Sequence, residues 1–262
     1  MPRNVEAKSV ESDADVTFAA IESQTTMNDR RSLIAVRNSV RRAVGEYTYL
    51  EIGSHLGGSL QPFVLDPSCK LMWSIDKRPA VMPDARGSRF EYADNSTARM
   101  VALLTALDPA IGDRLRWIDS DAADIPASTI NPAPKLMFVD GEHTDRAVYS
   151  DGEFCRRVMD PAGSVLVFHD AQIVYLGLRQ LFLDWEAAGV PFTAYHLPDV
   201  LMVVEFGLAI HDDAEIRPLL LNNHVGYLTS LFVNDVYRHV ANRFPAKQYW
   251  ALRKTAKRWL RR

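Results

Sequence analysis

Along this chain, segments with the hydrophobic pattern of β-strands alternate with segments that have the pattern of α-helices. The order of these segments predicts the order of the strands and helices. Short apolar segments rich in strand-forming residues predict buried strands at residues 47–53, 71–76, 114–119, 135–140 and 164–170. Between them, apolar residues at helical spacing predict helices at residues 31–45, 97–107, 144–159 and 176–188. Two further strand-like segments, 191–197 and 200–207, are joined by a Pro-Asp turn and predict a terminal hairpin.

Strands that alternate with helices are typical of α/β proteins with a parallel sheet. We therefore predict a Rossmann-like, seven-stranded, mostly parallel sheet with an antiparallel terminal hairpin and helices on both faces. Residues 31–207 would form this domain. The polar residues 1–30 are expected to form a flexible arm or a lid-like helix, and residues 208–262 a helical C-terminal extension.

The last residues of the sequence are rich in basic and aromatic residues. Residues 247–262 contain seven basic residues and no acidic one, together with aromatic residues at helical spacing. Such a basic amphipathic helix either packs through its aromatic side chains or makes a weak contact with an anionic membrane surface. The helical segment before it is expected either to cover the active site or to form a contact in a homo-oligomer.

Charge and composition exclude several classes of protein. The chain has 33 acidic and 30 basic residues, and a net charge of −3 argues against a nucleic-acid partner. Its two cysteines, Cys69 and Cys155, cannot form a disulfide framework or a zinc site of the CxxC type. No segment is apolar enough to span a membrane, and no secretory signal is visible, so we expect a cytoplasmic protein.

Each of the five predicted parallel strands ends in an acidic residue. These residues are Glu51, Asp76, Asp119, Asp140 and Asp170. In open α/β sheets the ligand crevice lies at the carboxyl ends of the strands. Acidic residues also end strands and cap helices for structural reasons alone, but five in series favour a functional site.

A glycine-rich loop, EIGSHLGGS, follows the first strand at residues 51–59. Gly53 suits a tight turn, and the glycines at 57 and 58 let a ligand approach the backbone. The loop lacks the lysine of a Walker loop and departs from the GxGxxG spacing of dinucleotide-binding proteins. Asp76 lies 23 positions after Gly53, close to the spacing expected of an acid that binds ribose hydroxyls. Together these features predict an adenosine-type cofactor over the first two strands.

Five segments resemble class I S-adenosylmethionine-dependent methyltransferases: EIGSHLGGS, SIDKRP, DSDAADIP, FVDGEHTDRAVYSD and PAGSVLVFHD. They are most similar to the branch that includes macrocin-type sugar O-methyltransferases and cephalosporin-hydroxylase-like proteins of bacterial secondary metabolism and glycan modification. The resemblance covers about residues 45–207. It implies transfer of the methyl group of S-adenosylmethionine to a hydroxyl of a sugar or a small natural product.

The resemblance also implies roles for individual residues. The cofactor-binding residues would be Glu51, Gly53, Ser54, Gly57, Gly58, Ser59, Asp76, Asp121, Ala122 and Asp140. Among them, Asp76 would hold the ribose, while Asp121 and Ala122 would flank the adenine. Asp140 would lie near the methyl group.

Three residues form a candidate metal site. Asp140 ends one strand and the pair His169 and Asp170 ends its neighbour, so the three side chains can meet. They would hold Mg²⁺ or Mn²⁺, which would bind the acceptor hydroxyl and lower its pKa. Related metal-dependent enzymes usually carry two adjacent acids at the second position. The alternative is therefore a hydrogen-bonded histidine at 169 and a capping aspartate at 170.

A general base is the remaining requirement for methylation of a hydroxyl. His143 is the first candidate because its ordinary pKa is near neutrality, and Glu142 is the second. Asp140 completes the expected catalytic set. A position at the N-terminus of a helix would also account for both candidates without any catalytic role.

Two other functions remain open from the sequence. A nicotinamide-dependent oxidoreductase could use the same loop, although the glycine spacing counts against it. A non-catalytic, membrane-associated binding protein could keep the fold and use the basic tail, although the complete set of acids at the strand ends counts against it.

Overall fold

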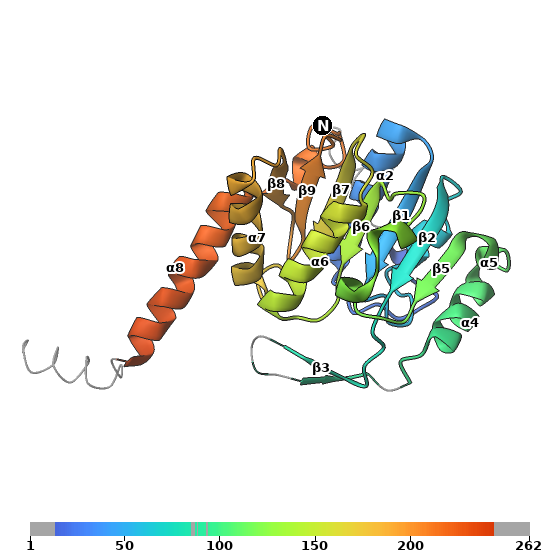
Figure 1. The fold of residues 1–262 in the computed structure, drawn as a ribbon, viewed down its shortest axis with the longest axis horizontal. Helices are drawn as coiled ribbons and strands as arrows, with labels where there is room; N and C mark the ends of the chain where they lie inside the picture. Colours follow the sequence, from blue (N-terminus) through green and yellow to red (C-terminus); the bar gives the residue numbers. More distant parts are fainter. Residues whose placement is uncertain (1–13, 85–86, 88, 93, 244–262) are drawn as a thin grey trace, which may run out of the picture.

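A computed structural model describes residues 14–243 of the chain, except 85–86, 88 and 93 (Figure 1). Its centre is an eight-stranded sheet with the strand order β10-β8-β9-β7-β6-β1-β2-β5. The parallel strands are β1 (Tyr47–Ile52), β2 (Cys69–Ile75), β5 (Leu115–Ile118), β6 (Leu136–Val139) and β7 (Ser164–Phe168). The antiparallel pairs involve β8 (Thr193–His196), β9 (Met202–Phe206) and β10 (Asn222–Asn223). The predicted fold class is confirmed, with the two-residue edge strand β10 as an addition.

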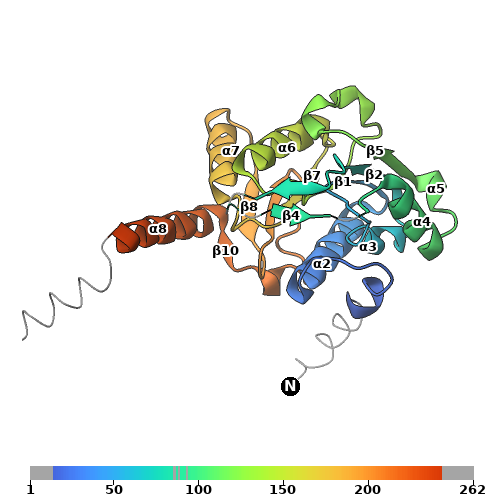
Figure 2. The same cartoon turned by 90° about the horizontal axis from the view of Figure 1, so that it is seen from below.

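Helices cover both faces of this sheet. They are α2 (Met27–Val44), α3 (Gln61–Val64), α4 (Thr97–Leu107), α5 (Ile111–Arg114), α6 (Asp145–Val158), α7 (Tyr175–Ala187) and α8 (His224–Arg243). Short 3₁₀ turns are η1 (Ala122–Asp124), η2 (Ala127–Thr129) and η3 (Arg217–Leu219). Seen along the sheet, α2 and α3 lie on one side and α6 and α7 on the other (Figure 2).

Alternating side chains of the strands divide the core into two clusters. Tyr49 and Phe138 point to the α2 side, whereas Leu50 and Val139 point to the α6 and α7 side. All the residues of β1, β6 and β7 are buried, as expected for parallel strands covered on both faces. The strand sequences are therefore almost continuously apolar because both faces of these strands are covered.

Helix ends follow the local chemistry of the sequence. In α2, Thr26 accepts a hydrogen bond from the backbone N–H of Asp29, and the Asp29 carboxylate accepts one from the N–H of Thr26. This capping box begins the helix at Met27, four residues before the predicted start. The helix ends at Gly45, whose φ of 76° suits a residue without a side chain.

The C-terminal extension corrects one prediction. Residues 208–223 are not helical: they form loops, η3 and the edge strand β10, and α8 begins only at His224. Pro218 and the pairing of Asn222 with His196 explain the difference, because proline lacks a backbone donor and the paired asparagine is extended. The predicted basic tail, 247–262, lies outside the described residues.

α8 extends away from the rest of the protein in both views (Figures 1 and 2). It packs against α7 near its start and exposes apolar side chains, including Val233 and Tyr237, farther along. Across the described residues, no helix combines the length and apolar character needed to cross a membrane.

An antiparallel hairpin, β3 (Val81–Pro83) and β4 (Arg89–Glu91), follows β2 and was not predicted. It crosses the carboxyl ends of the parallel strands, below the sheet in Figure 1. Met82 on this hairpin is buried, and Asp84 pairs with the backbone of His143. The hairpin therefore covers the edge at which the sequence predicts a site.

A buried glutamine ties the N-terminal segment to the glycine-rich loop. The Gln61 side-chain oxygen accepts hydrogen bonds from the backbone N–H groups of Ala20 (3.0 Å) and Ile21 (2.8 Å). Its amide nitrogen donates to the carbonyl oxygens of Ile21 and Gly58, both at 2.8 Å. Phe18 and Ile21 are also buried, so residues 18–21 are packed against the domain.

We expect Gln61→Ala to lower the free energy of unfolding by roughly 2–4 kcal/mol, because it leaves several buried backbone groups without partners. Urea unfolding measures the loss, and hydrogen exchange should show that residues 18–26 become less protected. The control is Gln180→Ala, since Gln180 is exposed and bonds only Asp184. Equal stability of the two variants would contradict this role of Gln61.

Candidate active site

Two adjoining cavities lie at the carboxyl ends of the parallel strands. Cavity 1 has a volume of about 420 Å³ and is bounded by the glycine-rich loop, the N-terminal segment and the ends of β6 and β7. Cavity 2 has a volume of about 300 Å³ and lies between η1 and the first turns of α6. Both cavities are lined by Gly53, Asp76 and Met82, so the hairpin residue Met82 stands at their junction.

Gly53 brings the ends of two strands together. Its φ is +90°, and a Cβ atom at this position would lie 2.1 Å from the carbonyl oxygen of Asp140. No other residue type fits both the backbone conformation and this approach. The glycine therefore allows Asp140 to stand directly beside the glycine-rich loop.

The predicted cofactor residues of the loop separate into two groups. Ser54, Gly58 and Ser59 line cavity 1 together with Gly53. Glu51 does not line either cavity: it is fully buried beneath the loop and accepts hydrogen bonds at 2.6 Å from the hydroxyls of Tyr49 and Ser59. Gly57 also lies away from the cavities, where it packs against the side chain of Leu104.

Asp76 is buried at the junction of the cavities. Its carboxylate accepts hydrogen bonds from the backbone N–H of His55 (2.8 Å) and of Arg78 (2.7 Å). These two donors fix the carboxylate where a ribose between the cavities would meet it. Asp119, by contrast, faces Arg78 at 3.4 Å and lines neither cavity.

Cavity 2 contains the predicted adenine-flanking residues Asp121 and Ala122. Glu142 also lines cavity 2 and pairs with Lys77 at 3.0 Å, while Lys77 lies 3.1 Å from Asp121. The two candidate bases are therefore separated, because Glu142 lines cavity 2 and His143 lines cavity 1.

The floor of cavity 1 gathers two histidines and several carboxylates. His143 Nε2 lies 3.2 Å from an Asp170 oxygen and 3.8 Å from an Asp140 oxygen. Asp140, His143 and Asp170 each offer a ligand atom, and these three atoms lie within 4.8 Å of one another. His143 thus joins the two predicted metal-binding aspartates.

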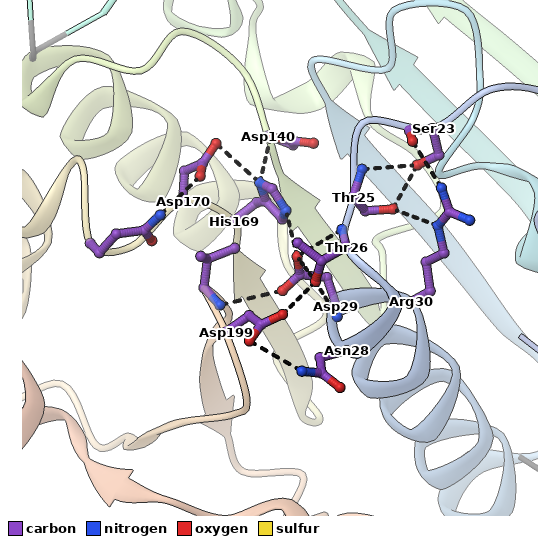
Figure 3. Close-up of polar contacts among 12 residues, drawn as sticks. Ser23, Thr25, Thr26, Asn28, Asp29, Arg30, Asp140, His169, Asp170 and Asp199 are labelled. Carbon is purple, nitrogen blue, oxygen red and sulfur yellow. Dashed lines mark hydrogen bonds and ion pairs between the residues drawn. The ribbon is translucent and has the colours of Figure 1, made fainter. Parts of the chain in front are cut away.

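His169, the third residue of the predicted metal set, is held between carboxylates (Figure 3). Its Nδ1 lies 3.1 Å from Asp140 and 3.3 Å from Asp170, and its Nε2 lies 3.5 Å from Asp29. Asp29 comes from the start of α2, outside the segment of the resemblance. The structure therefore brings Asp140, His169 and Asp170 together and adds an unforeseen acid beyond them.

These contacts set the protonation of the cluster. Burial lowers the pKa of His169, but the carboxylates of Asp140, Asp170 and Asp29 raise it by more. The pKa of His169 is therefore well above its usual value. The pKa of His143 is also raised, since Asp140, Asp170 and Asp84 outweigh its burial. The pKa of Asp140 is lowered, because the two histidines outweigh the effect of burial.

Several residues of the cavities were missed by the sequence analysis. They are Glu22, Ser23, Gln24, Thr26 and Asp29 of the N-terminal segment, Met82 and Tyr92 near the hairpin, and Asp151 of α6. The capping pattern of Thr26 and Asp29 could have revealed where α2 begins. Nothing local in the sequence reveals that this helix start faces β7.

Residues 50–171 match the family model described as a methyltransferase domain. The match begins within β1 and runs past the end of β7, so it contains the second half of β1, the four other parallel strands and most of the residues of both cavities. The predicted resemblance to class I methyltransferases is confirmed over this segment of the chain. The match favours methyl transfer over a nicotinamide-dependent oxidoreductase. No curated protein matches the sequence significantly.

Two solved structures are similar in fold. CalS11, a calicheamicin methyltransferase, superposes with a TM-score of 0.49 and 14% identity over 79% of this chain and 95% of that chain. TomG, an O-methyltransferase of Streptomyces achromogenes involved in tomaymycin synthesis, superposes with a TM-score of 0.46 and 15% identity over 78% and 90% of the two chains.

Glu51→Gln should change how stability depends on pH. Burial raises the pKa of Glu51 from 4.5 to about 7, so the folded state holds a proton that the unfolded chain releases. This stabilisation is fully present below pH 4.5 and is lost as the pH rises through 7. We expect wild-type stability to fall between pH 5 and pH 8 by roughly 2 kcal/mol more than that of Glu51→Gln.

Urea unfolding at the two pH values measures this difference. Glu46→Gln is the matched control, because the Glu46 side chain is 70% exposed. An identical loss of stability in wild type and Glu51→Gln would show that Glu51 does not carry this pH dependence.

Proposed function

We propose that this protein is an S-adenosylmethionine-dependent O-methyltransferase whose acceptor is a hydroxylated small molecule, with a sugar as the favoured class. The observation that carries the proposal is the Asp140, His143 and Asp170 cluster on the floor of cavity 1, next to the cofactor loop. A hydroxyl is a weak nucleophile at neutral pH, so its methylation needs a group that removes or stabilises its proton. This cluster supplies such groups.

The lining of cavity 1 supports a polyhydroxylated acceptor. Hydroxyl, amide and carboxylate groups of Glu22, Ser23, Gln24, Thr26, Asn95 and Gln172 surround it. Such groups suit a ligand with many hydroxyls better than an apolar one. The concentration of carboxylates also disfavours an anionic acceptor.

In this mechanism the chain acts mainly by positioning. Ser54, Gly58 and Ser59 would hold the methionine part of the cofactor, and Asp76 would accept hydrogen bonds from its ribose. The cofactor supplies an electrophilic methyl group, and Asp140, which lines cavity 1, would lie near that methyl group. Holding two substrates in line for displacement provides much of the rate enhancement in such reactions.

Asp140, His143 and Asp170 also fit a divalent cation. One imidazole nitrogen and two carboxylate oxygens within 4.8 Å form a donor set suited to Mg²⁺ or Mn²⁺. A bound cation would lower the pKa of the acceptor hydroxyl and orient it. The second candidate is a metal-independent reaction in which His143 itself removes the proton.

Calorimetry with S-adenosylhomocysteine tests the cofactor assignment. We expect the wild-type protein to bind it and Asp76→Ala to bind it at least about tenfold more weakly, because the ribose loses a charged acceptor. Asp119→Asn is the control, since Asp119 ends the neighbouring strand but lines neither cavity. A wild-type protein that does not bind S-adenosylhomocysteine would refute the proposed function.

Binding of Mn²⁺, followed by electron paramagnetic resonance, tests the metal without any knowledge of the acceptor. We expect Asp170→Asn to weaken Mn²⁺ binding at least about tenfold, because a charged ligand is lost. Asp160→Asn is the control, because Asp160 pairs with Lys135 outside the cavities. A wild-type protein that binds no Mn²⁺ would exclude the metal-assisted reaction and leave His143 as the group that removes the proton.

A further inference from the structure

Asp151 is a buried carboxyl group on the wall of cavity 2. It lies in the middle of α6, only 6% of its surface is exposed, and it lines the cavity beside Ser150 and Ala147. One of its oxygens lies 3.4 Å from the position that a Cβ atom on Gly141 would occupy. Within the described part of the chain, Asp151 makes neither a hydrogen bond nor an ion pair.

A buried carboxyl group without a partner is energetically costly. Two cations, Lys77 and Arg146, also line cavity 2, but neither pairs with Asp151, and Lys77 is already held by Glu142 and Asp121 at 3.0 and 3.1 Å. Burial raises the pKa of Asp151 to about 7, in keeping with the lack of a partner. Since cavity 2 is the open space that Asp151 faces, a hydrogen-bond donor of a ligand would satisfy it.

The position of the cofactor identifies that donor. Asp76 stands at the junction of the cavities, and the methionine-binding loop residues line cavity 1, so the purine beyond the ribose belongs in cavity 2. Asp121 and Ala122 of η1 flank this cavity on one side, and α6, which packs against η1, carries Asp151 on the other. The purine would therefore extend from the ribose toward Asp151.

Adenine and hypoxanthine differ in what they offer to a carboxyl oxygen. Adenine presents an exocyclic amine, which donates hydrogen bonds, whereas a 6-oxopurine presents an oxygen, which only accepts them. A carboxyl oxygen accepts from the amine in either protonation state. A 6-oxo group at the same place would face an ionised carboxylate with no proton between them, and only the protonated form of Asp151 could donate a hydrogen bond to it.

We propose that Asp151 accepts a hydrogen bond from the exocyclic amine of the cofactor's purine and thereby selects adenosyl over 6-oxopurine cofactors. This proposal rests on S-adenosylmethionine as cofactor but not on the identity of the acceptor or on the metal. Sites that bind a ligand donor in this way discriminate strongly against analogues that lack it.

The test compares the dissociation constants of S-adenosylhomocysteine and S-inosylhomocysteine by calorimetry at pH 8, above the pKa of Asp151, so that its carboxyl group is mostly ionised. We expect wild type to prefer the adenosyl ligand by roughly a hundredfold or more, and Asp151→Ala to lower this preference at least about tenfold by weakening adenosyl binding. Asp151→Asn should also lower the preference, but by strengthening inosyl binding, because the amide can donate to the 6-oxo group. This second variant keeps the shape of the side chain in case the alanine variant does not fold.

Glu153→Gln is the matched control, because Glu153 lies on the same helix and bonds Trp185 outside cavity 2. Its preference should equal that of wild type. An unchanged preference in both Asp151 variants, or an equal loss of affinity for both ligands, would overturn the proposal and leave Asp151 a structural role. If wild type binds neither ligand, the cofactor assignment fails and the proposal with it.

Discussion

The close approach of Gly53 to the carbonyl oxygen of Asp140 is the contact on which the arrangement of the site depends. It joins the ends of β1 and β6 so closely that no side chain fits between them. Because of this contact, the cofactor loop and the first acidic residue of the reactive cluster are fixed relative to one another by backbone alone. Both cavities are also lined by Gly53, so the same contact fixes the two cavities relative to one another.

Carboxylates have different functions in this site according to what surrounds them. Asp76 is held by two backbone donors, so it presents a fixed acceptor. Asp140 and Asp170 face histidines, which favours the ionised form of Asp140. Glu51 and Asp151 are buried without a cation, and burial raises both pKa values to about 7. Three of the five acids at strand ends, Asp76, Asp140 and Asp170, line the cavities, and the sequence pattern did not distinguish them from Glu51 and Asp119, which do not.

The sequence predicted those features that depend on local patterning. The hydrophobic periods of the sequence predicted the main strands and helices of the sheet domain. The glycine-rich loop and Asp76, predicted to bind the cofactor, line the same cavity. Features that depend on distant contacts were not predictable: Asp29 meets His169 across the sheet edge, and Met82 reaches the junction of the cavities from a three-residue strand. The extension was expected to be helical from residue 208, but pairing of Asn222 with β8 keeps it extended to residue 223.

The hydrogen bonds of Gln61 connect two segments of the sequence that line different parts of cavity 1. Glu22 and Asp29, which line cavity 1, come before the segment that matches the methyltransferase family. The glycine-rich loop lies within that segment. A single buried side chain joins the two by hydrogen bonds to backbone atoms, which every residue type provides. Substitutions of the side chains at residues 22–24 can thus change the lining of cavity 1 without removing the hydrogen bonds that hold this segment next to the glycine-rich loop.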